Sequence, residues 1–237
     1  MSYLILIRHG QSTWNLERRF TGWVDVDLTE NGKLEAKKSG DLIKDLKIEI
    51  DYYYSSLQLR AINTLKLVQK SLNDKQNFTK AWQLNERHYG ALTGLNKVEM
   101  IKKLGEEKVY QFRRSWDLRP EPLDKQSPFH PLNIDTYKNI QIENIPDTES
   151  LKDTFLRVTN YYNEEIKKNL IKGNILISAH GNSIRALCKH LFRIDEIKIS
   201  KLEIPTGNPL LIEIDNNQKI KSYKYLNEDR ATDLLFF

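Results

Sequence analysis

The 237-residue chain contains a single cysteine, Cys188, so it cannot form an internal disulfide bond. Such sparse use of cysteine is typical of proteins in reducing compartments. A long apolar segment at the start is also missing, because the run from Met1 to Ile7 is ended by Arg8. That run is too short for a secretory signal or for a helix that spans a bilayer. We therefore expect a cytoplasmic protein without membrane contact.

Neither sign of charge dominates the sequence. The sequence contains 37 Lys and Arg residues and 32 Asp and Glu residues, which gives a net charge of +5. Basic and acidic residues alternate in segments such as 102–108. The sequence has no basic stripe and no basic motif interleaved with aromatic residues, which argues against nucleic-acid binding. A locally basic site for a small anionic substrate would agree with the same charge.

Sequence patterns that bind metals and nucleotides are missing as well. The five histidines stand at positions 9, 88, 130, 180 and 190, without a close His pair and without a set of cysteines beside them. We therefore expect no metal ion. The Gly-Lys-Ser/Thr pattern of a phosphate-binding loop is absent, so nucleotide binding is not indicated.

Apolar runs predict the strands. Continuous runs at 3–7 and 174–179 and a shorter one at 51–55 predict buried strands. The segments 209–214 and 219–225 flank an Asp-Asn-Asn turn, which predicts a final hairpin.

The segments between these strands have features that predict helices. Thr29 is expected to cap a helix, and 61–72 has apolar residues three or four apart. A further helix is expected to begin at Asp147 or Thr148 and to be capped by Gly173. The apolar face expected for the first helix consists of Leu34, Leu42, Ile43 and Leu46.

Alternating strands and helices predict an α/β fold with an open, mostly parallel twisted sheet and helices on both faces, in three layers. We expect one domain over residues 1–237, interrupted by a lid-like insertion at about 86–146. Two short helical patterns reach to about Trp116, and a loop rich in proline and polar residues follows, with Pro120, Pro122, Pro128 and Pro131. Connections of this length are often lids or binding loops. A variable surface insertion without a role is the alternative.

Two strand ends carry the same pair of residues. Arg8-His9-Gly10 follows the first strand, and His180-Gly181 follows a later one. Ligands of such sheets bind at the carboxyl ends of the strands. A single histidine at a strand end is often structural, but two His-Gly pairs in equivalent places favour a shared site.

These residues suit phosphoryl transfer. A neutral imidazole is a competent nucleophile toward phosphorus, and Arg8 beside His9 offers a planar cation for phosphate oxygens. The two glycines allow backbone N–H groups to approach an anion, and Gly181 opens a helix whose N-terminus favours negative charge. His180 is placed to donate a hydrogen bond from the other side. The pattern predicts a metal-independent phosphoryl-transfer enzyme with His9 as nucleophile.

Longer strings resemble one family. Arg8-His9-Gly10-Gln11-Ser12 with Trp14-Asn15 resembles the signature of the histidine phosphatase superfamily. Within this superfamily, the sequence resembles the cofactor-dependent phosphoglycerate mutases from residue 3 to about residue 226. The strings that carry this narrower resemblance are Arg19 to Trp23, Leu84 to Lys97, Arg113-Arg114, Ala179 to Leu187 and Ile204 to Gly207.

The resemblance implies a role for each matching residue. His9 corresponds to the phosphorylated histidine, Glu86 to the proton donor and acceptor, and His180 to the residue that stabilises the transferring group, with Arg8 beside them. The residues implied to bind phosphate or substrate are Arg8, Gly10, Gln11, Ser12, Asn15, Thr21, Gly22, Arg60, Glu86, Arg87, His88, Tyr89, Lys97, Arg113, Arg114, Gly181 and Asn182.

As a whole, the resemblance implies interconversion of 2-phosphoglycerate and 3-phosphoglycerate through a phosphohistidine and a bisphosphoglycerate intermediate. It implies 2,3-bisphosphoglycerate as the priming phosphoryl donor, small phosphoglycerates as partners, and a homo-oligomer, either a dimer or a tetramer. The rivals are a histidine phosphatase that hydrolyses small phosphate monoesters, a bisphosphoglycerate-making relative, and a binding domain without activity.

Two features depart from the resembled pattern. Gln11 stands where a glutamate is usual, which removes a negative charge near the nucleophile. The tail from Asn227 onward does not match the basic tails of longer members and ends in Leu234-Leu235-Phe236-Phe237. If such tails cover the site, this one acts differently.

Overall fold

The computed structural model describes residues 1–233, so the apolar end at 234–237 lies outside the described residues. Six strands form one sheet: β1 (Ser2–Arg8), β2 (Tyr52–Ser55), β3 (Thr79–Lys80), β4 (Ile175–Ala179), β5 (Leu210–Ile214) and β6 (Ile220–Tyr225). The order is β3-β2-β4-β1-β5-β6, parallel from β3 to β1 and antiparallel from β1 to β6. The prediction of an open, mostly parallel sheet with a final hairpin is confirmed.

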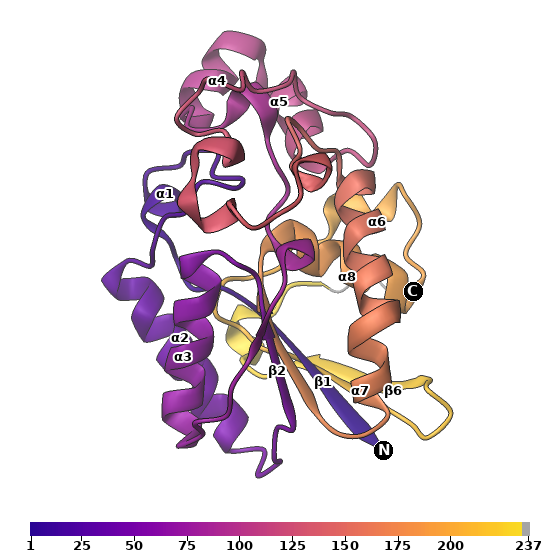
Figure 1. The fold of residues 1–237 in the computed structure, drawn as a ribbon. Coiled ribbons are helices and arrows are strands. Elements are labelled where there is room, and N and C mark those ends of the chain that lie inside the picture. Colours follow the sequence, from indigo (N-terminus) through magenta and orange to yellow (C-terminus); the bar gives the residue numbers. More distant parts are fainter. Residues whose placement is uncertain (234–237) are drawn as a thin grey trace.

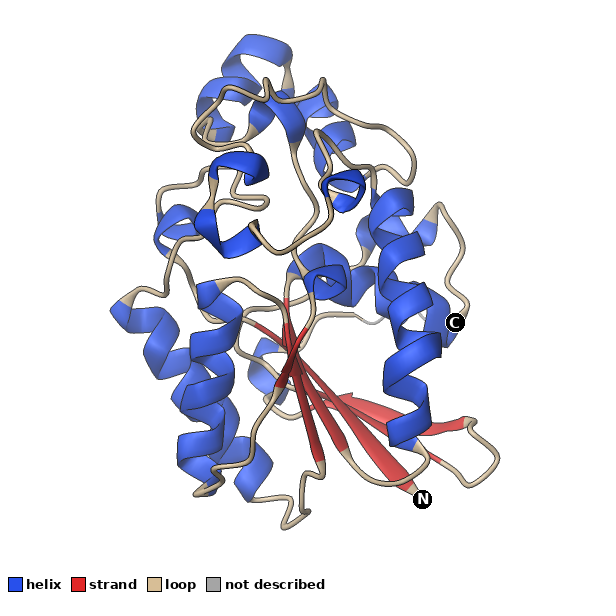
Figure 2. Ribbon diagram, viewed as in Figure 1, coloured by secondary structure: helices blue, strands red, loops and turns tan. Residues whose placement is uncertain are grey.

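Helices cover both faces of this sheet (Figures 1 and 2). Leu4 and Leu6 of β1 pack on one side, whereas Ile5 and Ile7 pack on the other, and none of the four is more than 1% exposed. Successive side chains of a strand point to opposite faces, so this fully apolar strand requires a helical layer on each face. The two layers are α2 (Glu30–Lys44) with α3 (Leu59–Leu72), and α6 (Leu151–Tyr161) with α7 (Lys167–Leu170) and α8 (Gly181–Phe192).

Helix α2 begins as predicted, since the Thr29 side chain accepts a hydrogen bond from the Gly32 backbone. The predicted apolar face is wrong at Leu34, which is 66% exposed. The buried face instead carries small residues as well as Ile43, and it includes Gly40. Small residues let α2 and α3 approach closely, and a search for large apolar side chains overlooks such a face.

Helix α6 begins later than predicted. Its N-cap is Ser150, which forms a reciprocal capping box with Asp153. The helix continues through a π-turn, Tyr162–Ile166, into α7, which ends at Leu170. The cap expected at Gly173 is therefore wrong; a Cβ there would lie 2.3 Å from the Asp51 carboxylate, so close packing explains this glycine.

The segment predicted as an insertion stands over the carboxyl ends of the parallel strands (Figure 1). An apolar cluster joins Leu92, Met100 and Val109 of this segment to Phe20, which lies in the loop after β1. No helix within residues 1–233 is long and apolar enough to cross a membrane. The short elements of this upper region are α1 (Thr13–Leu16), η1 (Trp82–Leu84), η2 (Gly90–Leu92), α4 (Lys97–Leu104), α5 (Glu106–Arg114), η3 (Pro131–Asn133), η4 (Asp135–Tyr137) and η5 (Ile142–Asn144); η7 (Lys198–Lys201) and η8 (Glu228–Arg230) follow α8.

The parallel register brings the two predicted strand ends together. Arg8 is paired with Ala179, and the His9 backbone N–H donates to the Ala179 carbonyl at 3.0 Å. His9 and His180 therefore leave neighbouring strands at the same edge, and their rings lie 5.0 Å apart between centroids.

The close packing of Gly32 against the loop that carries His9 can be tested by substitution. A Cβ on Gly32 would lie 2.0 Å from the Gln11 carbonyl oxygen, whereas one on Gly40 would lie 2.6 Å from the Ser71 Cβ in α3. Helix propensity alone would favour alanine at both positions by about 1 kcal/mol. We expect both substitutions to destabilise the protein by about 1–3 kcal/mol through overpacking. Denaturant unfolding measures this loss.

Only Gly32→Ala is expected to displace the loop that carries His9, and kcat should then fall by about tenfold or more. Gly40→Ala is the matched control in the same helix and should keep the wild-type kcat. Wild-type kcat in Gly32→Ala would contradict the proposed dependence of His9 on this contact.

Candidate active site

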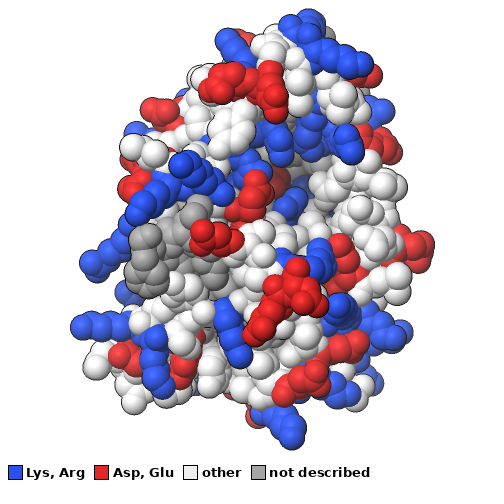
Figure 3. Space-filling model, turned by 180° about the vertical axis from the view of Figure 1, so that it is seen from behind, with Lys and Arg blue, Asp and Glu red and all other residues white. Residues whose placement is uncertain are grey.

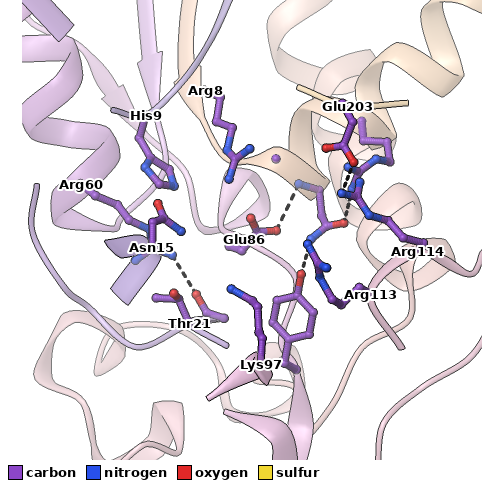
Figure 4. Close-up of a pocket in the computed structure, with 15 residues that line it drawn as sticks. Arg8, His9, Asn15, Thr21, Arg60, Glu86, Lys97, Arg113, Arg114 and Glu203 are labelled. Atoms are coloured by element: carbon purple, nitrogen blue, oxygen red, sulfur yellow. Dashed lines mark hydrogen bonds and ion pairs between the residues drawn. The ribbon is translucent and has the colours of Figure 1, made fainter. Parts of the chain in front are cut away.

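A cavity of about 130 Å³ opens at the strand ends (Figure 4). The loop after β1 and the first turns of α8 form its floor, and α4 and α5 contribute side chains from above. The residues that line it are Arg8, His9, Asn15, Thr21, Gly22, Arg60, Glu86, Tyr89, Lys97, Arg113, Arg114, Gly181, Asn182, Arg185 and Glu203.

Positive charge dominates this cavity. Six of its lining residues are Lys or Arg, and two, Glu86 and Glu203, are acidic. Viewed from behind, Lys and Arg side chains gather in a hollow below the upper helices (Figure 3). An excess of fixed cations in a partly enclosed space favours a small ligand with several negative charges.

His9 is held as a neutral nucleophile. Its ring is buried, and Nδ1 lies 2.7 Å from the Gly10 carbonyl oxygen. A carbonyl only accepts, so Nδ1 carries the proton and Nε2 keeps its lone pair. Burial, followed by the nearby cations Arg60 and Arg8, lowers the pKa of His9 well below its usual value. The ring therefore stays uncharged at neutral pH, as attack on phosphorus requires.

His180 stands beside the nucleophile, with its ring 5.0 Å from that of His9, although it is not among the residues that line the cavity. Its Nε2 is 2.7 Å from the Ser56 hydroxyl, and its buried Nδ1 has no hydrogen-bond partner among the described residues. The Gln58 backbone donates to the same hydroxyl oxygen. When the Ser56 proton is donated to Nε2, Nδ1 carries the ring proton and is free to donate to a ligand. Burial, then Arg60, lowers the pKa of His180 well below its usual value.

The two arginines of the floor, buried Arg60 and half-buried Arg8, are fixed by backbone carbonyls. Arg60 donates to Gly22 and Val24, each at 2.9 Å, and Arg8 donates to Ile204 at 2.7 Å. The Nε of Arg8 is buried without a partner among the described residues. A buried donor of this kind is costly unless a ligand satisfies it, which indicates an anion at this place.

Glu86 is a buried carboxylate in the same cavity. Its Oε1 accepts from the backbone N–H groups of Arg87 at 2.8 Å and Asn182 at 3.2 Å. The Glu86 backbone is held in turn by the Gln58 side chain at 2.9 Å. These bonds use only Oε1, so Oε2 remains available to exchange a proton with a ligand.

The upper helices supply three further cations. Lys97 begins α4, and Arg113 and Arg114 end α5. Burial, then Arg113 and Arg8, lowers the pKa of Lys97 to about 8, so it is still mostly protonated at neutral pH. Arg114 forms an ion pair with Glu203.

Gly10 and Ser12 are not among the residues that line this cavity, and Gln11 lines an adjoining pocket that shares Arg8, Asn15, Lys97 and Arg113 with it. The Gly10 backbone donates to the Thr64 hydroxyl, and the Gln11 side chain accepts from Thr29. Ser12 caps α1 and exchanges hydrogen bonds with Asn15, which does line the cavity. These hydrogen bonds fix the shape of the loop, and contact of the three residues with substrate stays a prediction.

Arg87 and His88 also lie away from the cavity, and both are fully buried. Arg87 donates to the Phe112 carbonyl of α5, and its guanidinium lies 4.7 Å from the centre of the Tyr89 ring. Nδ1 of His88 accepts from the Gly90 backbone at 3.0 Å, and burial lowers the pKa of His88 to about 3. Glu86 and Tyr89 reach the cavity while the two residues between them face inward.

Two lining residues were not predicted. Arg185 stands four residues after Gly181, so helical periodicity places both on one face of α8, and this signal would have found it. Glu203 lies in an irregular segment, and nothing in the local sequence marks it. Within residues 1–233 no group of three or more His, Cys, Asp or Glu side chains is arranged to hold a metal ion.

Comparisons with known proteins agree with this geometry. The family model of the histidine phosphatase superfamily (branch 1) matches residues 4–227. A curated 2,3-bisphosphoglycerate-dependent phosphoglycerate mutase from Pelagibacter ubique (strain HTCC1062) is 67% identical over 238 residues, covering 100% of both chains. One from Hydrogenobaculum sp. (strain Y04AAS1) is 47% identical over 233 residues, covering 98% of this chain and 94% of that protein.

Solved structures share the fold. YhfR of Bacillus stearothermophilus superposes with a TM-score of 0.69 at 21% identity, covering 99% of this chain and 100% of that one. The alpha-ribazole phosphatase of Shigella flexneri gives a TM-score of 0.67 at 19% identity and 98% coverage of both. At such low identity the likeness concerns architecture alone.

The charge state of His9 can be tested by NMR titration of histidine-labelled protein. We expect the His9 ring to stay neutral, with the proton on Nδ1, down to mildly acidic pH. Arg60→Met removes the largest electrostatic cause of the lowered pKa, so the pKa of His9 should rise. Lys97→Met, which removes another cavity cation, is the control and should leave it unchanged. A charged His9 ring at neutral pH in the wild type would contradict this account.

Proposed function

Because the chain belongs to the histidine phosphatase superfamily and, within it, to the family of the bisphosphoglycerate-dependent phosphoglycerate mutases, we propose that it interconverts 2-phosphoglycerate and 3-phosphoglycerate through a phosphohistidine at His9. This isomerisation belongs to glycolysis and gluconeogenesis. The observation that carries the proposal is a neutral His9 with Nε2 free, in a cavity lined by six cations.

The cavity fits the proposed cofactor. 2,3-Bisphosphoglycerate supplies the phosphoryl group that primes His9. Buried donors at Arg8 Nε and Arg114 Nη1 have no partner within residues 1–233, and such donors suit phosphate or carboxylate oxygens.

The floor of the cavity handles the transferring phosphoryl group. His9 Nε2 attacks phosphorus, while Arg8 and Arg60 compensate the charge on the equatorial oxygens. The His180 Nδ1–H donates from the neighbouring strand end. These groups are fixed before the ligand arrives, so little reorganisation is needed during transfer.

Glu86 handles the proton. When phosphorylated His9 passes its phosphoryl group to the hydroxyl of a monophosphoglycerate, the hydroxyl loses a proton, which Oε2 of Glu86 accepts. The product is a bisphosphoglycerate intermediate. After this intermediate reorients, His9 takes the other phosphoryl group and Glu86 returns the proton.

The upper helices hold the intermediate. Lys97, Arg113 and Arg114 face the cavity from α4 and α5, opposite His9 (Figure 4). Arg87 ties α5 to the segment that carries Glu86. A covered cavity keeps water from the phosphohistidine, which distinguishes a mutase from its hydrolytic relatives.

The remaining parts of the proposal concern setting and partners. We propose that the enzyme acts in the cytoplasm without a metal ion and without nucleic acid, and that it assembles as a homo-oligomer, either a dimer or a tetramer. The single cysteine, Cys188, supports the choice of compartment, and the arginines that line the cavity support metal-free catalysis.

Glu86→Gln tests the proton transfer. The amide keeps the size of the side chain but cannot accept the hydroxyl proton. We expect kcat to fall by a factor of about 10² to 10⁴ while the Kd of phosphoglycerate changes only a few-fold. Steady-state kinetics and calorimetry measure the two quantities. A near-normal kcat would assign the proton transfer to another group.

The ratio of hydrolysis to isomerisation separates the mutase from a histidine phosphatase. Isomerisation should greatly exceed phosphate release in the wild type and should be activated by trace 2,3-bisphosphoglycerate. The double variant Arg113→Ala/Arg114→Ala should raise the ratio by about tenfold, because it uncovers the phosphohistidine. Lys102→Ala/Lys103→Ala, on the exposed side of α4, is the control. Wild-type phosphate release as fast as isomerisation would support the phosphatase instead.

A further inference from the structure

Arg185 lines the cavity but has no role in the mechanism above. It lies in the second turn of α8 and is 4% exposed. Its Nη1 donates to Oδ1 of Asn182 at 2.6 Å, and its Nε donates to the Leu202 carbonyl at 2.8 Å. Two bonds in different directions fix the planar guanidinium.

This arginine determines how the Asn182 amide is turned. A guanidinium has donors only, so the amide must present its oxygen to Arg185. The amide nitrogen then points the other way, and it donates to the Tyr89 hydroxyl oxygen at 3.0 Å. The opposite orientation would set the Asn182 NH₂ group against the donors of Arg185.

The orientation of the amide decides what Tyr89 offers. Its hydroxyl oxygen already accepts from Asn182, so the hydroxyl proton points elsewhere. Tyr89 lines the cavity, and its hydroxyl makes no other hydrogen bond within residues 1–233. The proton is therefore left for a ligand.

We propose that Arg185 is a positioning residue that, through the Asn182 amide, makes Tyr89 a hydrogen-bond donor to the anionic substrate. This rests on the proposed function, because phosphoglycerate is the anion in question. Without Arg185 the amide can rotate, and Tyr89 then donates to Oδ1 of Asn182 rather than to the ligand.

A purely electrostatic role for Arg185 makes a different prediction. Five other cations line the cavity. If Arg185 acted only through its charge, its loss would weaken the binding of an anion whether or not residue 89 carries a hydroxyl. Loss of orientation matters only when the hydroxyl is present. Tyr89→Phe therefore separates the two.

The experiment measures the Kd of 3-phosphoglycerate by calorimetry. Arg185→Met is expected to weaken binding by about ten- to a hundredfold, the usual effect of losing one hydrogen bond to a charged group. Arg185→Lys, whose ammonium also only donates, should recover most of this loss. In the Tyr89→Phe background, Arg185→Met should weaken binding by no more than about twofold further.

Equal losses from Arg185→Met in the wild-type and Tyr89→Phe backgrounds would overturn the proposal, as would a lysine variant that binds no better than the methionine variant. If Arg185→Met does not fold, Arg185→Gln gives the same comparison, because glutamine lets the amide take either orientation. Binding does not require turnover, so a wild-type protein that binds without isomerising would overturn the proposed function and leave this comparison intact.

Discussion

The hydrogen bond from His9 Nδ1 to the carbonyl of its neighbour Gly10 is the interaction on which the site depends. It fixes the tautomer of His9, so that Nε2 is unprotonated, and it ties the ring to the short loop that places His9 in the cavity. That loop is held against the start of α2, where a Cβ on Gly10 would lie 2.1 Å from the Gly32 carbonyl oxygen. The buried strand β1 positions the loop, the close contact between Gly10 and Gly32 holds it, and the proton on Nδ1 leaves Nε2 free to act as the nucleophile.

The surrounding cations contribute in two ways. Arg60 and Arg8 help to keep the His9 ring neutral, because a second positive charge beside them is unfavourable. The same residues are directed at the place where phosphate charge is expected, each fixed by backbone carbonyls. Arg60 and Arg8 thus act on both partners: they add to the effect of burial in keeping His9 neutral, and they are placed to stabilise the phosphate. Lys97 and Arg114 add charge from the upper helices.

The layered fold was predictable because β1 is apolar on both faces and because strands alternate with helices. The floor of the site was predictable because parallel register places the residues after β1 and β4 side by side. Leu34 was misjudged since α2 packs through small residues. The inward direction of Arg87 and His88 depends on an irregular segment, which no local pattern reveals, and their contact with substrate stays a prediction. Glu203 reaches the cavity only through tertiary folding, so no local pattern reveals it.

Phosphorylation of His9 is the most direct test of the account. The protein is incubated with 2,3-bisphosphoglycerate, and the acid-labile phosphate is located by tandem mass spectrometry under neutral conditions. The account predicts phosphate on His9 in the wild type, the same site phosphorylated more slowly in Glu86→Gln because the departing hydroxyl lacks its proton donor, and neither phosphate nor isomerisation in His9→Ala. Phosphate located on His180 instead, or full isomerisation by His9→Ala, would contradict it.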